Sequence, residues 1–190
     1  GFRGLEAGPD SAIHRAIREL NLGGVVLFDH DVPTGSDRRN IASPAQLRQL
    51  TDQLQGVRPG TLLIAVDQEG GRVARLGPDN GFRAEASARE LGRGEPAATG
   101  KQGRTTARRL AAAGINWNFA PVVDLARNPE NPVIAGLGRS FGTDPERVSE
   151  QAGAFIRGHR REGVLTAVKH FPGHGSARGD SHKGLVDITT

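Results

Sequence analysis

Four short, largely apolar segments, each preceded by a helix-like pattern, limit most strongly how this chain can fold. They cover residues 24–28, 61–66, 115–123 and 164–168. They lack the regular apolar–polar alternation of half-exposed strands, which is typical of parallel strands covered on both faces. Strands that alternate with helices in this way predict an α/β fold with a parallel sheet.

Helix signals fill the intervals between these strands. Ser43 and Pro44 are preferred residues for the cap and the first position of a helix. Thr143 and Glu146 have the spacing of a capping box, which predicts a helix start at Thr143. Residues 78–94 are expected to be loop-rich with one short helix. The predicted helices cover residues 11–20, 43–54, 101–113 and 143–163.

Each predicted strand ends in polar residues. Asp29, Asp67 and Asp124 follow the first three strands, and Lys169 with His170 follows the fourth. In a parallel sheet the carboxyl ends of the strands share one rim, where such folds place their chemistry. We therefore expect these side chains on one side of the molecule.

Two architectures fit this pattern, a doubly wound sheet and part of an eight-stranded barrel. The first strand lacks the Gly-x-Gly-x-x-Gly turn of dinucleotide-binding sheets, because Asp-His-Asp follows it at 29–31. A complete barrel needs about 250 residues. The prediction is therefore a (β/α)₈ TIM barrel of which residues 1–190 form the N-terminal half to two-thirds. Alone, such a part would expose unpaired strand edges, and we expect it to be poorly stable or to self-associate.

Composition removes several classes of partner. The net charge is +4, but there is no basic run and aromatic residues make up only 4%, so we expect no nucleic-acid binding. No apolar run approaches the roughly 20 residues of a membrane span. The chain has no cysteine, which excludes disulfides and cysteine-based metal sites.

Residues 169–182 have the composition of an active site. They hold one of only three lysines, three of the six histidines and an aspartate, on a glycine-rich loop that follows a buried strand. Catalytic residues concentrate on such loops. If the chain is extended there, Asp180 and His182 point the same way, and a carboxylate beside an imidazole suits proton transfer. The alternative is a solvated loop with ordinary polar residues.

Two other chemistries are possible for this loop. Ser181 invites a hydrolase triad, but its side chain would face away from both neighbours, and no Gly-x-Ser-x-Gly elbow exists. A divalent metal could bind His170, His174, Asp180 and His182. Because Pro-Gly separates His170 from His174, helical spacing cannot align these two, and we expect no metal.

Polar residues elsewhere on the predicted rim suggest a carbohydrate ligand. Asp67 and Glu69 form the kind of carboxylate pair that glycosidases use. The alternative for Glu69 is a surface ion pair with Arg72. Arg139 could clamp an oxygen-rich ligand, or it could be an ordinary solvated arginine.

Taken together, several strings resemble glycoside hydrolase family 3, specifically its bacterial β-N-acetylglucosaminidases, in the order found in that family. The most specific are Lys-His-Phe-Pro-Gly-His-Gly at 169–175 and Asp-Ser-His at 180–182. The others are Gly-Phe-Arg-Gly at 1–4, Gly-Gly-Val-Val-Leu-Phe at 23–28, Asp-Gln-Glu-Gly-Gly-Arg-Val at 67–73, Asn-Phe-Ala-Pro-Val-Val-Asp at 118–124, Asn-Pro-Glu-Asn-Pro-Val at 128–133 and Arg-Ser-Phe-Gly at 139–142.

The resemblance implies a (β/α)₈ barrel and a retaining mechanism without a metal or cofactor. It implies that Asp180 and His182 form a catalytic acid/base dyad on a mobile loop. It also implies a substrate-binding set that holds the hydroxyls and the N-acetyl sugar, formed by Asp67, Arg75, Arg139, Lys169 and His170.

The sequence departs from the family at two places. Ser-Ala-Arg-Gly at 176–179 precedes Asp180, where the family usually has an Asp-Thr pair after the glycine. The family's nucleophile is an aspartate on a later strand, beyond residue 190, so this chain alone is expected to be inactive.

The resulting expectation is an exo-β-N-acetylglucosaminidase acting on cell-wall muropeptides or chitin-like saccharides, and a monomer when complete. The alternatives are a non-hydrolytic sugar-binding barrel, a β-glucosidase- or β-xylosidase-like member of the family, and a metal hydrolase. Relatives include cytoplasmic and exported or lipid-anchored bacterial enzymes, and the sequence does not choose between these locations.

Overall fold

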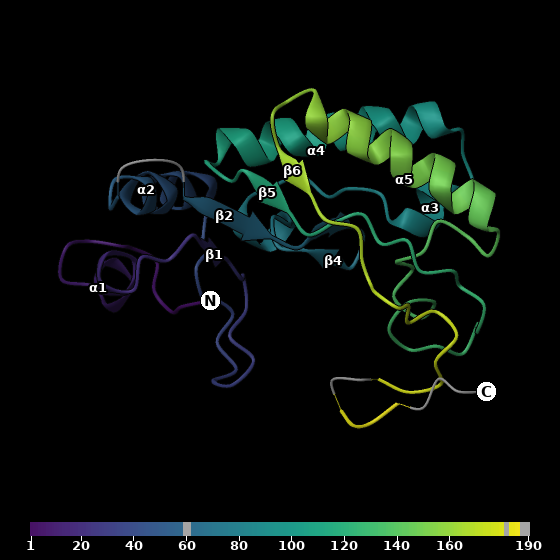
Figure 1. Ribbon diagram of the computed structural model, residues 1–190, viewed down its shortest axis with the longest axis horizontal. Helices are drawn as coiled ribbons and strands as arrows, with labels where there is room; N and C mark the ends of the chain where they lie inside the picture. Colours follow the sequence, from purple (N-terminus) through teal and green to yellow (C-terminus); the bar gives the residue numbers. More distant parts are fainter. Residues whose placement is uncertain (59–61, 181–182, 187–190) are drawn as a thin grey trace.

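A computed structural model describes residues 1–58, 62–180 and 183–186 of the chain, and its centre is a four-stranded parallel sheet (Figure 1). The sheet contains β1 (Gly24–Val26), β2 (Leu63–Val66), β5 (Trp117–Asn118) and β6 (Leu165–Thr166). The strands lie side by side in the order in which they occur along the chain. A doubly wound sheet reverses this order at its ligand site, whereas a barrel does not. The order therefore confirms the prediction of part of a barrel.

The third strand is shorter than predicted. Only Trp117–Asn118 of the apolar segment at 115–123 forms a strand, and Pro121, which has no N–H to donate, interrupts the ladder. Parallel pairing then resumes between Val122 and Lys169. Asn118 pairs with Thr166, so the chain advances four residues from Asn118 to Val122 while the partner strand advances three, from Thr166 to Lys169. One extra residue on one strand is the pattern of a β-bulge. The peptide bonds Ala120–Pro121 and Lys169–His170 are cis.

The helices largely follow the sequence prediction. Ser11 caps α1 (Ala12–Glu19), and Ser43 caps α2 (Pro44–Gln55), with Pro44 in the first turn. The short helix expected within 78–94 is α3 (Ala88–Gly92), preceded by a 3₁₀ turn at Pro78–Asn80. α4 (Pro96–Ala112) begins five residues earlier than predicted, because Pro96 can occupy the first turn of a helix.

The last helix, α5 (Pro145–Arg160), corrects one prediction. Its cap is Asp144, whose carboxylate accepts hydrogen bonds from the backbone N–H groups of Glu146 and Arg147. The capping box expected from Thr143 and Glu146 is therefore wrong by one position. An aspartate is as good a cap as a threonine, and Pro145 then takes the first helical position, where proline is favoured.

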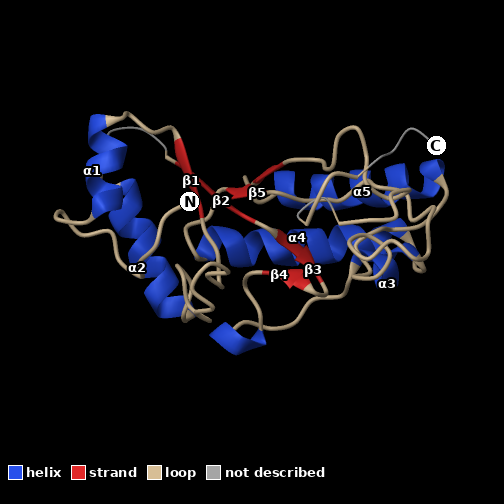
Figure 2. Cartoon of the chain, turned by 90° about the horizontal axis from the view of Figure 1, so that it is seen from below, coloured by secondary structure: helices blue, strands red, loops and turns tan. Residues whose placement is uncertain are grey.

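Helices α4 and α5 lie against each other over one face of the sheet, while α1 and α2 lie at the end of the sheet formed by β1 (Figures 1 and 2). Glycines allow the close approach of α4 and α5. A Cβ atom at Gly158 would lie 2.6 Å from the backbone oxygen of Gly100, and one at Gly103 would lie 2.7 Å from that of Phe155. Of the helices in the described ranges, none has the length and apolar character needed to cross a membrane.

A buried polar network joins α5 to the sheet directly beneath the rim. His159, fully buried on α5, donates from Nδ1 to the backbone oxygen of Phe155 at 3.1 Å and accepts at Nε2 from Asn118 at 3.0 Å. The Asn118 amide bonds both backbone groups of Gln68, at 2.9 and 3.0 Å. Burial lowers the pKa of His159 to about 4, against a smaller upward effect of the bond to Phe155. The imidazole is therefore neutral at physiological pH.

A hairpin that the sequence analysis did not predict follows β2. Its strands are β3 (Gln68–Gly70) and β4 (Val73–Ala74), which pair antiparallel with a register shift between Gln68 and Gly70. Gly70 and Gly71 have φ values of +90° and +60°, which favour glycine. The hairpin places Glu69 next to Lys169, which follows β6.

Candidate active site

A cleft of about 740 Å³ lies at the carboxyl ends of β2 and β6. It is lined by all five residues of the predicted substrate-binding set and by Asp180, among others. These side chains come from the ends of β2 and β6, from the β3–β4 hairpin and from the described residues of the segments at 125–142 and 169–180. The structure thus brings residues together that lie more than 110 positions apart in the sequence.

Lys169 makes two ion pairs at the cleft. Its Nζ lies 2.6 Å from Asp67 Oδ1 and 2.6 Å from Glu69 Oε1. Asp67 follows β2 and Lys169 follows β6, so this contact is the meeting of two strand ends that the sequence predicts. The side chains of Lys169 and Asp67 remain 18% and 19% exposed, which leaves both accessible to a ligand.

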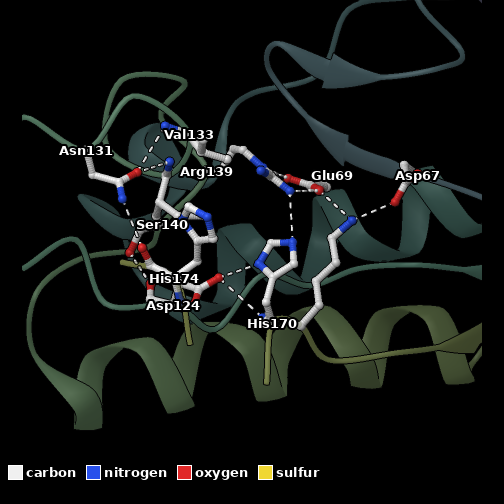
Figure 3. A network of polar contacts seen from close by, with 11 residues as sticks. Asp67, Glu69, Asp124, Asn131, Val133, Arg139, Ser140, His170 and His174 are labelled. Atoms are coloured by element: carbon white, nitrogen blue, oxygen red, sulfur yellow. Dashed lines mark hydrogen bonds and ion pairs between the residues drawn. The ribbon is translucent and has the colours of Figure 1, made fainter. Parts of the chain in front are cut away.

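Glu69 is more buried than Asp67, and it pairs with a different arginine from the one expected from the sequence. Its two oxygens accept hydrogen bonds from Nε and Nη2 of Arg139, both at 2.8 Å (Figure 3). This is the bidentate geometry of the strongest carboxylate–guanidinium pairs. Arg72 is exposed and does not pair with Glu69, so the surface ion pair is wrong.

Arg139 is held in place from its own loop. Asn131 Oδ1 accepts hydrogen bonds from the backbone of Val133 and Ile134, and Ser140 Oγ donates to the backbone oxygen of Asp124 at 2.6 Å (Figure 3). Burial lowers the pKa of Arg139, but the bonds and charge of Glu69 outweigh it and raise that pKa above its ordinary value. Arg139 is therefore a permanent cation, not a solvated loop arginine.

Asp124 fixes His170. Its Oδ2 accepts from the ring Nδ1 of His170 at 2.5 Å and from the backbone N–H at 3.2 Å, and its Oδ1 accepts from the backbone N–H of His174 (Figure 3). Burial alone would raise the pKa of Asp124, but these hydrogen bonds outweigh it and leave the pKa below its usual value. From the sequence, Asp124 is expected on the rim but has no assigned role, because its position after an apolar segment is the only signal.

His170 also contacts Arg139, whose Nη2 lies 3.2 Å from His170 Nε2. Arginine can only donate, so Nε2 is the acceptor nitrogen of the ring. The proton of a neutral His170 then lies on Nδ1 and is donated to Asp124. Both ring nitrogens of His170 are thus engaged by groups of the protein.

Arg75 lies at the side of the cleft nearest β1. Its Nη1 lies 3.3 Å from Asp29 Oδ1, and its guanidinium carbon is 6.0 Å from the centre of the Phe28 ring. Within the described ranges, Arg75 Nε is buried without a hydrogen-bond partner. The contact joins the end of β1 to the β3–β4 hairpin.

The predicted catalytic dyad is described only in part. Asp180 lines the cleft, together with Lys183. His182 and Ser181 lie outside the described residues, so the pairing of Asp180 with His182 stays a prediction. In the part that the structure describes, no group of three His, Cys, Asp or Glu side chains could hold a metal ion.

The cleft presents alternating hydrogen-bond donors and acceptors. Its acidic side chains in the described residues are Asp67, Glu69 and Asp180, and its basic ones are Arg75, Arg139, Lys169 and Lys183. Lys169 and Arg139 each lie within 2.8 Å of a carboxylate oxygen. Donors and acceptors placed side by side can bond the hydroxyl groups of a sugar, each of which both donates and accepts.

Known proteins resemble this chain over most of its length. The family model described as Glycosyl hydrolase family 3 N terminal domain matches residues 4–190. A β-hexosaminidase of Pseudomonas aeruginosa (strain LESB58) is 40% identical over 173 residues, which are 90% of this chain and 48% of that protein. The β-hexosaminidase LpqI of Mycobacterium tuberculosis is 44% identical over 138 residues, 72% of this chain and 35% of that protein.

Solved structures extend the similarity to three dimensions. A glycoside hydrolase family 3 β-N-acetylglucosaminidase from Paenibacillus has a TM-score of 0.84 at 39% identity, over 96% of this chain and 33% of that chain. NagZ from Neisseria gonorrhoeae in complex with N-trifluoroacetyl-D-glucosamine has a TM-score of 0.84 at 34% identity, over 97% and 52%. The chain spans about half the length of the P. aeruginosa relative, 48%.

Proposed function

This chain belongs to glycoside hydrolase family 3, and from that premise we propose that it is the N-terminal part of the barrel of a retaining exo-β-N-acetylglucosaminidase. The gene product that contains it would remove terminal β-linked N-acetylglucosamine from muropeptides or chitin-like saccharides. The observation that carries the proposal is the meeting of Asp67, Arg139, Lys169 and His170 around one cleft that Asp180 also lines.

The binding step rests on the paired charges at the rim. Lys169 and Arg139 would donate to the oxygens of the terminal sugar, and Asp67 would accept from a hydroxyl. Each of these side chains is already held by an ion pair within the protein, so little side-chain freedom is lost when the sugar binds. Arg75, on the side of the cleft toward β1, would complete the set.

The chemical step would use the Asp180–His182 dyad. Protonated His182 would donate its proton to the glycosidic oxygen while an aspartate beyond residue 190 attacks the anomeric carbon, so that the bond to the leaving group breaks as a covalent glycosyl–enzyme forms. Neutral His182 would then take a proton from water, which attacks the same carbon and releases the sugar with retained configuration. Asp180 would orient the imidazole and favour its charged form.

The names of the relatives are consistent with this substrate. Curated relatives are named β-hexosaminidases, and the Neisseria NagZ structure holds an N-acylated glucosamine. Transfer of that substrate to the present chain is supported by the four rim residues and by the Asp-Ser-His string at 180–182 of the sequence.

The test compares two chromogenic substrates with the gene product that contains this chain. We expect turnover of 4-nitrophenyl N-acetyl-β-glucosaminide well above that of 4-nitrophenyl β-glucoside. A preference for the glucoside would retain the family and contradict the dyad. Binding of N-acetylglucosamine without hydrolysis of either substrate would instead favour the non-hydrolytic barrel.

The role of His182 needs its own measurement. In the variant His182→Ala, hydrolysis of a substrate with a poor leaving group should fall far more than that of the 4-nitrophenyl glycoside, because a poor leaving group depends on protonation. Equal losses on both substrates would contradict the assignment of His182 as the general acid.

A further inference from the structure

Glu69 occupies the centre of the polar cluster without facing the solvent. Its side chain is 4% exposed and lies on the β3–β4 hairpin, while the three nitrogen atoms that contact it belong to two residues elsewhere in the chain. One carboxylate thereby accepts from Arg139 Nε, Arg139 Nη2 and Lys169 Nζ (Figure 3). No other carboxylate in the described part of the chain pairs with Arg139.

The contacts with Glu69, Asp67 and His170 use some of the N–H groups of Arg139 and Lys169 and leave the others for a ligand. Arg139 has one N–H on Nε, which goes to Glu69, and two on Nη2, which go to Glu69 and to His170 Nε2. Only the two N–H groups of Nη1 are left uncommitted by contacts within the described residues. Lys169 has three N–H groups, of which Asp67 and Glu69 take one each, so one is left.

Glu69 therefore determines which donors the cleft can offer. If it were absent, Arg139 could rotate about its side-chain bonds and present any of its nitrogens, and the contact that sets the acceptor nitrogen of His170 would be lost with it. Arg139 is 9% exposed, and a buried cation without its partner is costly. The same change would leave Lys169 with Asp67 alone.

We propose that Glu69 is a positioning residue that fixes Arg139 and Lys169 as an array of three N–H donors for the sugar hydroxyls and, through Arg139, holds His170 as an acceptor. Glu69 acts through these residues and does not bind the sugar itself. The inference rests on the proposed function, since it concerns recognition of the same terminal sugar.

The experiment measures how strongly the enzyme distinguishes a substrate from its deoxy analogues. The gene product that contains this chain is assayed with 4-nitrophenyl N-acetyl-β-glucosaminide and with its 3-, 4- and 6-deoxy forms. For the hydroxyl that the array binds, removal should lower kcat/KM of the unaltered enzyme by about 10- to 100-fold, as expected for a hydrogen bond to a charged group.

In Glu69→Gln, the side-chain NH2 group faces the N–H groups of Arg139 and Lys169, and donors do not bond donors. The three-donor array should therefore lose its geometry. We expect kcat/KM on the full substrate to fall by about 100-fold. The decisive result concerns the deoxy analogues. In this variant, removal of the same hydroxyl should lower kcat/KM by less than about 3-fold, because a displaced donor no longer forms a hydrogen bond with it. A purely structural role would lower all four rates by a common factor and leave the ratios unchanged.

Glu85→Gln is the matched control. Glu85 is also a buried carboxylate, 5% exposed, with a 3.0 Å ion pair to Arg109, but it does not line the cleft. This variant should keep the discrimination of the unaltered enzyme, even if its unfolding temperature falls.

Each outcome is decisive. Full discrimination in a folded Glu69→Gln variant overturns the proposal. If that variant does not fold, Glu69→Asp keeps the charge and shortens the side chain by one methylene, and it should show intermediate discrimination. Full discrimination in Glu69→Asp, or failure of both variants to fold, would assign Glu69 to folding alone. Absence of hydrolysis by the unaltered enzyme would instead contradict the proposed function.

Discussion

Asp124 and His170 are joined by two hydrogen bonds to one carboxylate oxygen, 2.5 Å from the ring Nδ1 and 3.2 Å from the backbone N–H. The side chain of Asp124 is fully buried, whereas that of His170 is 35% exposed in the cleft. A buried anion thus sets both the proton position and the orientation of a ring that a ligand can reach. Such supporting contacts affect activity without touching the ligand.

The variant Asp124→Asn should lose this control. Its amide would donate to Nδ1, and the ring proton would move to Nε2, where it would face the N–H of Arg139. We expect kcat/KM for the N-acetylglucosaminide to fall by about 100-fold. Asp31→Asn is the control, because Asp31 is a buried carboxylate paired with Arg3 and Arg39 outside the cleft. A loss of the same size in both variants would contradict the role of Asp124.

Acid should destabilise the fold through His159. Its pKa is about 4 in the folded chain and about 6.5 when unfolded, so between these values the unfolded state binds the additional proton. Stability from the neutral ring is complete above pH 6.5 and is lost as the pH falls toward 4. Between pH 7.5 and 5.0 the loss should be about 2 kcal/mol. Urea unfolding of the gene product should show a smaller fall for His159→Gln, and an equal fall would contradict this origin.

The contact between α4 and α5 should not tolerate a methyl group at Gly158. Alanine normally favours a helix over glycine by about 1 kcal/mol, but here its Cβ would lie 2.6 Å from backbone atoms of α4. Overpacking of this kind costs about 1–3 kcal/mol, so Gly158→Ala should lower the unfolding temperature. Gly23→Ala, where no atom lies within 4 Å, is the control. A rise in stability for Gly158→Ala would contradict the packing of α4 on α5.

The start of α5 offers a direct test of a corrected prediction. Asp144→Ala removes the side chain that bonds two N–H groups of the first turn and should cost about 1 kcal/mol of unfolding free energy. Thr143→Ala should change stability by less than about 0.5 kcal/mol, as for an ordinary surface position. Calorimetry of the two variants decides, and the reverse order would restore Thr143 as the cap.

The rim could be predicted from the sequence, because it depends on simple local rules. Apolar segments mark the strands, and parallel strands place their carboxyl ends together, so Asp67 and Lys169 had to approach each other. Strand order could not be read directly, but the lack of a dinucleotide turn after residue 28 favoured the barrel, which the structure confirms.

The partner of Glu69 could not be predicted in this way. Arg139 lies 70 positions away on a loop whose shape depends on long-range hydrogen bonds, such as that from Asn131 Nδ2 to the backbone oxygen of Ala177. Arg72, three positions from Glu69, was the nearer choice in sequence. The β3–β4 hairpin that separates them is set by two glycines with positive φ, and local charge spacing contains no information about that turn.

The sequential order of the strands also affects how the protein is made. Each strand of the sheet pairs with the one synthesised before it, so β1, β2 and β5 need no later segment to complete their ladder. The growing chain could therefore fold stepwise as it leaves the ribosome. Leu165 on β6, the last strand of this order, is 54% exposed. Proteolysis of ribosome-bound chains arrested after about residue 190 should show protection of α4, and cleavage throughout would exclude this order of events.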